Sequence, residues 1–269
     1  IKDLKTIEPA VKNCDCIINM AALIGIPYSY IASSSYVDVN IKGTLNLLNC
    51  AKQFKVKKFI HTSTSEVYGS AKFVPITEKH PLNAQSPYAA TKIAADQLVN
   101  SYNKSFSLNT IIIRPFNTYG PRQSLRAVIP TIINQSLNND KIKVGNINTK
   151  RDFTFVTDTA NAFYKAILAG KKTNGKTINL GTGQEFTIKE IINYVSIILN
   201  KKIKIISDPK RIRPVKSEVI RLLSSNKIAK NYLKWIPKYK NRKGFIKGLK
   251  ITIKYLKDKK NNRITDYIK

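Results

Sequence analysis

Residues 86–115 read SPYAATKIAADQLVNSYNKSFSLNTIIIRP and carry the clearest structural signal in the chain. The first part, 86–106, is predicted to form a helix, and the apolar run at 108–115 has the length and composition of a buried strand. The same alternation occurs upstream, where residues 37–54 have apolar residues at helical spacing and residues 56–63, VKKFIHTS, form another apolar run. This order predicts right-handed βαβ units and a parallel sheet covered on both faces.

The second half of the chain predicts a smaller lobe. A first strand is expected at 16–22, and the pattern loosens after Pro115, where residues 116–123 are rich in turn formers. Beyond them we expect helices near 126–139, 157–170 and 187–199, with short strands at IKVG, TINLG and KIKII. We therefore expect an α/β fold with a doubly wound parallel sheet in 1–115 and a smaller, mainly substrate-binding α/β lobe in 116–269, some of whose elements return to the sheet.

Composition limits the class of protein. A chain of 269 residues with 42% hydrophobic content can bury a substantial core. Three cysteines and two histidines are too few for a convincing tetrahedral metal site, and an odd cysteine count does not fit a disulfide framework. We find neither an apolar run of membrane-spanning length nor an export signal, so no membrane partner and a cytoplasmic location are expected.

The formal charge of +31 raises the question of nucleic-acid binding. The excess comes mainly from lysines scattered over helix faces and loops, and no recognition motif or aromatic stacking platform accompanies them. We therefore favour a solvated basic surface over a nucleic-acid partner, and an anionic small-molecule substrate fits the charge equally well.

The helix at 86–106 carries a pair of residues suited to proton transfer. Tyr88 and Lys92 are four residues apart, so they lie on one helical face. A nearby ammonium stabilises a phenolate and lowers its pKa from about 10, so the pair is suited to taking a proton from an alcohol while hydride leaves the same carbon. The Tyr-x-x-x-Lys pattern is weak when it stands alone, because amphipathic helices produce it by chance.

A second cluster of polar residues follows the strand at 56–63. Residues 62–69, TSTSEVYG, place Ser63, Thr64, Ser65 and Glu66 at the strand end, where ligands bind in parallel α/β sheets. A carboxylate held in a closed site beside a sugar is suited to accepting a proton from carbon. Glu66 could equally be a surface loop carboxylate, but its occurrence with Tyr88 and Lys92 favours catalysis.

Eight motifs in chain order resemble the extended short-chain dehydrogenase/reductase superfamily, in the NAD-dependent epimerase/dehydratase branch that acts on nucleotide-activated sugars. They are NMAALIG, NIKGTLNLLNCAK, FIHTSTSEVYG, SPYAATKIAADQL, IIIRPFNTYGPRQ, RDFTFVTDTANAF, INLGTG and RPVKSEVIRLLSSNKIAKNYLKWIP. The TSEVYG segment resembles nucleotide-sugar 4,6-dehydratases and UDP-glucuronate decarboxylases. Further stretches are similar to GDP-mannose 4,6-dehydratase and, still more, to the dehydratases of legionaminic acid biosynthesis, which act on nucleotide-linked N-acetylglucosamine.

The resemblance implies a Rossmann-type fold, the cofactor NAD and a lyase mechanism. Tyr88, assisted by Lys92 and Thr64, would deprotonate the C4 hydroxyl while NAD⁺ accepts the C4 hydride. Glu66 would then remove the C5 proton, water would leave from C6, and the hydride would return to C6. Ser65 departs from the dTDP-glucose dehydratases, which carry Asp there as the acid, and it follows the GDP-mannose pattern instead. The acid for the leaving hydroxyl therefore stays open.

The resemblance also implies binding roles. Ala21, Ala22 and Ser63 lie at strand ends that would face the cofactor, which Tyr88 and Lys92 would also contact. Candidates for the substrate are Asn117, Arg122, Arg151 and Arg213, since guanidinium groups pair well with diphosphate oxygens. The helices at 37–54 and 86–106 resemble those that form a four-helix dimer interface in this superfamily, so a homodimer is expected.

A glycine-rich dinucleotide-binding turn is missing from the sequence. Such a turn lies between the first strand and helix of a dinucleotide-binding fold, whereas GTGQEF at 181–186 occurs far too late in the chain. By the register of the resemblance, roughly sixty residues, about one and a half to two βαβ units, are absent before Ile1. We therefore expect an N-terminally incomplete copy that binds NAD poorly on its own.

Alternatives of three kinds remain open at this stage. Within the enzymes they are UDP-glucuronate decarboxylation and 4-epimerisation, although 4-epimerases usually lack the glutamate at position 66. A nucleotide-sugar-binding scaffold without catalysis is the second kind. A basic interaction protein is the third, and it predicts salt-sensitive retention on nucleic acid.

Overall fold

The computed structural model describes residues 1–258, apart from the side chain of Lys210. Its main sheet has four parallel strands in the order β1-β2-β3-β7, and the predicted parallel α/β sheet is thereby confirmed. The strands are β1 (Cys16–Asn19), β2 (Lys58–Thr62), β3 (Thr110–Pro115) and β7 (Lys176–Leu180). Residues 259–269 of the predicted second lobe lie outside the described residues.

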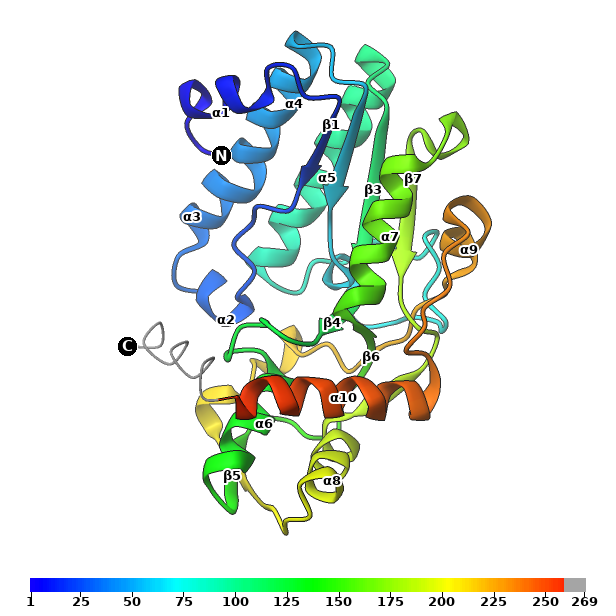
Figure 1. The fold of residues 1–269 in the computed structure, drawn as a ribbon. Coiled ribbons are helices and arrows are strands. Elements are labelled where there is room, and N and C mark those ends of the chain that lie inside the picture. The colour runs from blue at the N-terminus through cyan, green and yellow to red at the C-terminus, as the bar shows by residue number, and fades with distance from the viewer. Residues whose placement is uncertain (259–269) are drawn as a thin grey trace.

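Helices cover both faces of this sheet (Figure 1). One face packs against α1 (Leu4–Val11), α4 (Gly43–Gln53) and α5 (Pro87–Phe106), and the other against α7 (Val156–Leu168) and α9 (Lys227–Leu233). Successive strand residues point to opposite faces. Accordingly Phe59 joins the first apolar cluster and Ile60 the second. This burial on both sides explains why β2 and β3 read as continuous apolar runs in the sequence.

A smaller lobe lies below the carboxyl ends of the main strands in the view of Figure 1. Its core is a single apolar cluster in which the aromatic rings of Tyr119, Phe153 and Phe245 pack together. It contains β4 (Asn117–Tyr119), β5 (Lys141–Val144), β6 (Lys150–Phe155), β8 (Glu185–Thr187), β9 (Lys204–Ser207), β10 (Arg221–Leu222), α6 (Val128–Asn138), α8 (Ile188–Leu199) and α10 (Asn241–Lys257).

Several boundaries differ from the sequence prediction. The helix expected at 37–54 is a continuous helical segment made of α3 (Ser33–Tyr36), a π-helical turn (Val37–Lys42) and α4. The first strand ends at Asn19 rather than at residue 22. The TINLG strand, β7, pairs with β3 in the main sheet, so it is one element of the second half that returns there. The remaining short elements are α2 (Ile26–Ser29) and the 3₁₀ turns Ser65–Tyr68, Lys171–Thr173, Pro209–Arg211 and Val215–Ser217.

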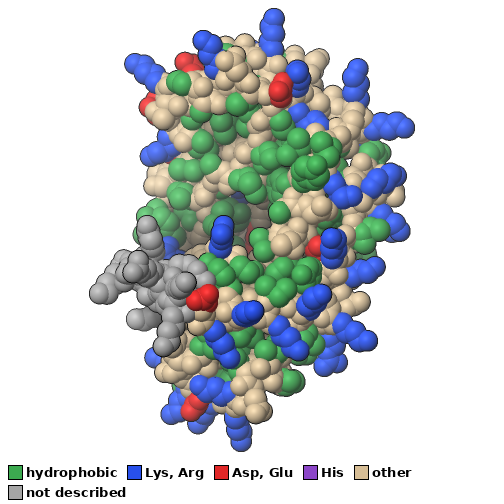
Figure 2. Space-filling view, viewed as in Figure 1, with side chains coloured by type: hydrophobic (Ala, Val, Ile, Leu, Met, Phe, Trp, Pro, Cys, Tyr) green, Lys and Arg blue, Asp and Glu red, His purple; other side chains and the backbone are tan. Residues whose placement is uncertain are grey.

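Lys and Arg side chains are spread over the face seen in Figure 2, including the surface of α10, rather than gathered in one patch. Within residues 1–258, no helix combines the length and apolar character needed to cross a membrane. The same described residues contain no group of three or more His, Cys, Asp or Glu side chains arranged to hold a metal ion.

Candidate active site

The turn after β2 places the predicted polar residues at the carboxyl edge of the sheet. Thr64 caps the 3₁₀ turn Ser65–Tyr68 by accepting a hydrogen bond from the backbone N–H of Glu66 at 3.2 Å. Gly69 ends the turn with φ of 63°, and a Cβ there would lie 2.5 Å from the carbonyl oxygen of Asn83. A residue with a side chain would therefore displace the turn that carries Glu66.

Helix α5 begins at the same edge because its capping residues are placed there. Ser86 accepts a hydrogen bond from the N–H of Ala89 at 3.1 Å, and Pro87 occupies the first helical position. Tyr88 and Lys92 then follow on the buried face, and they are only 6% and 3% exposed. The amine of Lys92 donates a hydrogen bond of 2.6 Å to the carbonyl oxygen of Thr62, so the helix and the end of β2 are joined directly.

Tyr88, Thr64 and Glu66 converge on one location. Burial raises the pKa of the Tyr88 phenol above its ordinary value, a hydrogen bond with Thr64 opposes that rise, and the charge of Glu66 adds to it. The predicted lowering of this pKa by Lys92 is therefore wrong for this structure. The physical reason is that the phenol lies in an apolar pocket, edge-on to the ring of Tyr36 at a centroid distance of 6.3 Å, while the Lys92 amine is directed toward Thr62.

Burial of Lys92 disfavours the charged form of its amine. Desolvation lowers the pKa of its amine from 10.5 to about 8, and the charge of Asp96 opposes this change. Since the pKa in the folded protein lies below the unfolded value, the contribution of Lys92 to stability is present above pH 10.5 and is lost as the pH falls through 8. The ammonium form is thus held in the site at the expense of fold stability.

We expect Lys92→Met to raise the free energy of unfolding at pH 7 and to abolish the activity predicted for this site. The shift of the amine pKa corresponds to about 3 kcal/mol at pH 7, and the lost hydrogen bond to Thr62 offsets about 1 kcal/mol of it. The gain in the free energy of unfolding over the unsubstituted protein should shrink between pH 7 and pH 10, as measured by urea titration. Lys104→Met, on the exposed end of α5, should show no such pH dependence. A gain that grows with pH would contradict the assignment.

A buried network that the sequence prediction missed lies beneath Lys92. Asp96, one further turn along α5, is 0% exposed and accepts hydrogen bonds from Arg114 Nε at 3.1 Å and Nη2 at 2.9 Å. The hydroxyl of Ser63 donates to the same carboxylate at 2.9 Å. Ser63 was predicted as a cofactor contact, but in this structure its hydroxyl is engaged with Asp96. The sequence signal was an arginine within an apolar strand, because such a charge needs a buried partner.

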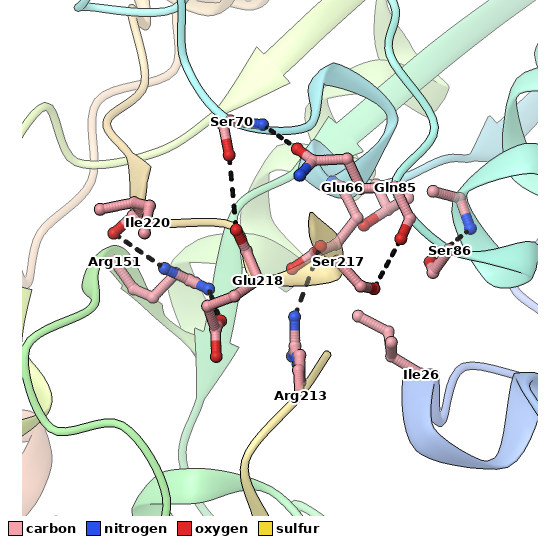
Figure 3. A network of polar contacts seen from close by, with 12 residues as sticks. Ile26, Glu66, Ser70, Gln85, Ser86, Arg151, Arg213, Ser217, Glu218 and Ile220 are labelled. Atoms are coloured by element: carbon pink, nitrogen blue, oxygen red, sulfur yellow. Dashed lines mark hydrogen bonds and ion pairs between the residues drawn. The ribbon is translucent and has the colours of Figure 1, made fainter. Parts of the chain in front are cut away.

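Glu66 lies beside the arginines that were predicted to bind the diphosphate. Arg213 approaches the Glu66 carboxylate at 3.8 Å, and Arg151 pairs with Glu218 at 3.7 Å (Figure 3). Burial lowers the pKa of Arg151, while the charges of Glu66 and Glu218 oppose that change. Segments around residues 66, 151 and 213 are far apart in the chain, yet the fold brings them to one place.

The other predicted binding residues are less uniform. Asn117 begins β4, and its buried side-chain oxygen has no hydrogen-bond partner among the described residues. Ala21 and Ala22 follow β1, where Asn40 fixes the loop by accepting from Leu23 N–H at 2.9 Å. Arg122 is exposed and has a positive φ of 66°. Ser65 is buried within its 3₁₀ turn.

The fold and this cluster define an α/β protein with a Tyr–Lys helix and a glutamate at the carboxyl edge of a parallel sheet. Residues 1–247 match the family model described as GDP-mannose 4,6 dehydratase, so the chain belongs to this family. The resemblance to the extended short-chain dehydrogenase/reductase superfamily and its Rossmann-type fold are thereby confirmed.

Individual relatives include dehydratases and epimerases. The chain is 39% identical over 195 residues to the dTDP-D-glucose 4,6-dehydratase of Dictyostelium discoideum. The matched segment covers 66% of this chain and 44% of that protein. It thus spans less than half the length of that relative.

Two solved structures are also similar. DesIV from Streptomyces venezuelae, a dTDP-glucose 4,6-dehydratase solved with NAD bound, has 25% identity and a TM-score of 0.86, covering 96% of this chain and 78% of that one. The UDP-glucuronic acid 4-epimerase from Bacillus cereus, in complex with UDP-glucuronic acid and NAD, has 28% identity and a TM-score of 0.87, covering 95% and 80%.

Proposed function

We propose that the protein is an NAD-dependent nucleotide-sugar 4,6-dehydratase that acts on a nucleotide-linked N-acetylglucosamine. The observation that carries this proposal is the convergence of Glu66 with Tyr88 and Thr64, because the reaction needs one group for the C4 hydroxyl and another for the adjacent C5 proton. A simple 4-epimerase has no need of a base at C5. The choice of N-acetylglucosamine rests on the motif similarity of AALIGIPYSY and RPFNTYGPRQSLRAVIP.

The carboxyl edge of the sheet fits NAD. The buried hydroxyl of Thr62 has no hydrogen-bond partner among the described residues, and the adjacent Lys92 amine has donors beyond its bond to the Thr62 carbonyl. The small side chains of Ala21 and Ala22 leave room for a ligand to approach the backbone after β1. When bound, NAD supplies reversible hydride acceptance, which makes the overall reaction redox-neutral. Lys92, the hydroxyl of Thr62 and the backbone after β1 would hold it, with Tyr88 beside it.

The residues of this chain move the protons. Tyr88 takes the C4 hydroxyl proton in its phenolate form and becomes the neutral phenol. Burial raises the pKa of this phenol, and the hydrogen bond with Thr64 lowers it and so favours the phenolate that the step needs. The ketone at C4 acidifies the C5 hydrogen, which Glu66 removes, and the hydroxyl at C6 leaves as water once it is protonated. Return of the C4 hydride to C6 and of a proton to C5 then completes the 4-keto-6-deoxy sugar, so the substrate loses one water in total.

The substrate diphosphate is assigned to Arg213 and Arg151. Both guanidinium groups lie beside Glu66, and paired N–H donors suit phosphate oxygens. The unpartnered side-chain oxygen of Asn117 is available for a sugar hydroxyl or amide N–H. We also propose a homodimer, based on the similarity of the 37–54 and 86–106 segments to dimer helices of the superfamily.

The test is to incubate the full-length protein and NAD with UDP-, GDP- and dTDP-linked hexoses, among them N-acetylglucosamine, and with UDP-glucuronate, and to weigh the products. A 4,6-dehydratase gives a 4-keto-6-deoxy sugar lighter by one water. Loss of carbon dioxide from UDP-glucuronate would establish a decarboxylase instead, and an unchanged mass with a new stereoisomer would establish an epimerase. Binding of a nucleotide sugar without any product would favour a scaffold.

A further inference from the structure

Residues 209–218 form a strap that is not anchored by apolar burial. The strap contains the 3₁₀ turns Pro209–Arg211 and Val215–Ser217, and Ile212 and Val215 are 51% and 91% exposed. The first buried apolar side chain that follows it is Val219, at 1% exposure. Yet this strap carries Arg213 to Glu66, so other interactions must fix its position.

Gln85 supplies the central part of these interactions. Its side-chain NH₂ donates to the carbonyl oxygen of Lys216 at 2.8 Å, and its side-chain oxygen accepts a hydrogen bond from the N–H of Ser70. Its backbone carbonyl accepts from the hydroxyl of Ser217 at 2.6 Å. One residue thus joins the strap to the turn that follows Glu66 (Figure 3).

Two further contacts hold the same stretch. The hydroxyls of Tyr30 and Ser217 lie 2.5 Å apart, and the hydroxyl of Ser70 donates to the carbonyl oxygen of Glu218 at 3.5 Å. Gln85 immediately precedes Ser86, the cap of the helix that carries Tyr88. The strap, the segment that follows the 3₁₀ turn Ser65–Tyr68 and the start of α5 are therefore linked at Gln85.

We propose that Gln85 is a positioning residue that clamps the 209–218 strap, so that Arg213 meets an anionic diphosphate from a fixed place beside Glu66. This inference rests on the proposed function for the identity of the ligand, whereas the clamp itself is a property of the protein alone. Glutamine is required because the position must both donate and accept: glutamate could accept from Ser70 but could not donate to Lys216, and leucine could do neither.

The first arm of the test is limited proteolysis, which requires no substrate. Trypsin cleaves after Lys216 and Arg211, both within the strap, and mass spectrometry follows these two bonds individually. Gln85→Leu should speed cleavage after Lys216 about tenfold, because two side-chain hydrogen bonds of the clamp are lost. Gln135→Leu is the matched control, since Gln135 also makes two such bonds, but to the backbone of Lys143. Equal cleavage rates in the two variants would overturn the clamp.

The second arm separates positioning from general damage to the fold. In Gln85→Leu the KM for the nucleotide sugar should rise about tenfold while kcat stays within about threefold. The KM of Gln85→Glu should lie between those of the leucine variant and the unsubstituted protein. In an Arg213→Gln background, the leucine substitution should raise KM by less than about twofold, because its effect acts through Arg213. A full tenfold effect in that background would overturn the inference.

The two arms also distinguish the inference from the proposed function. If no nucleotide sugar is turned over but trypsin cleaves the leucine variant faster, the clamp stands and the proposed reaction fails. Slower cleavage of the unsubstituted protein in the presence of UDP, GDP or dTDP would place a nucleoside diphosphate under the strap. If none of the three slows cleavage, the diphosphate role of the strap is overturned.

Discussion

Glu66→Gln is expected to lower the rate of dehydration by about 10²- to 10⁴-fold, the usual loss when a general base is removed. Glutamine has nearly the same shape and preserves the 3₁₀ turn, because the bond between Thr64 and the residue 66 N–H involves only the backbone at that position. The amide cannot accept a proton from C5. The substrate KM should change little, since Arg213 and Arg151 retain their guanidinium groups.

Deuterium exchange separates this step from the one before it. In heavy water the unsubstituted protein should incorporate deuterium at C5, and Glu66→Gln should not, while proton removal at C4 remains possible through Tyr88. Tyr88→Phe should abolish both the exchange and the dehydration, because the C5 hydrogen becomes acidic only after C4 is oxidised. Glu190→Gln is the matched control, since glutamine preserves the capping box of α8 outside the site. Turnover of Glu66→Gln within threefold of the unsubstituted protein would contradict the assignment.

Local signals predicted the elements that position the site. The Ser-Pro pair at 86–87 marks a helix start, and α5 runs from Pro87 to Phe106, in close agreement with the predicted 86–106. The apolar runs of β2 and β3 were equally readable, because strands buried on both faces show little polar alternation. The π-helical turn could not be predicted from local sequence. In this turn the side chain of Asn40 contacts Leu23 and Thr91, and these contacts depend on segments that are distant in the chain.

Charged partners were the least predictable feature. Nothing near residue 66 in the sequence indicates that Arg213, carried by an exposed strap, would lie beside its carboxylate. The prediction that Tyr88 and Lys92 lie on one face of the helix is correct. The direction of the Tyr88 pKa shift, however, depends on the apolar pocket formed with Ile26 and Tyr36. Arg122 was the weakest of the predicted substrate contacts, and the fold leaves it exposed. Pairing across the chain is a property of tertiary structure rather than of local pattern.

Arg114→Met is expected to lower the free energy of unfolding by about 3–5 kcal/mol at pH 7, because it leaves the carboxylate of Asp96 buried without its partner. Arg114 is 4% exposed, and besides Asp96 it donates to the Tyr68 hydroxyl at 2.9 Å. Urea titration measures the loss. Arg126→Met, at an exposed position of the loop before α6, should stay within about 0.5 kcal/mol of the unsubstituted protein.

The cause of this loss can be tested through its pH dependence. Burial raises the pKa of Asp96 and Arg114 opposes that rise, so removing Arg114 should raise the pKa in the folded protein further above its unfolded value. A carboxyl with such a raised pKa contributes stability at low pH that is lost as the pH rises. The destabilisation of Arg114→Met should therefore be smaller at pH 5 than at pH 8.

A double variant separates the unpaired charge from lost packing. If the stranded carboxylate is the main cost, Asp96→Leu combined with Arg114→Met should be less destabilised than the sum of the two single variants. Additive losses that do not vary with pH would mean that the pair contributes mainly through packing, and that Lys92 keeps its place without it. Non-additive, pH-dependent losses would show that this ion pair sets the charge environment in which Lys92 and Tyr88 work.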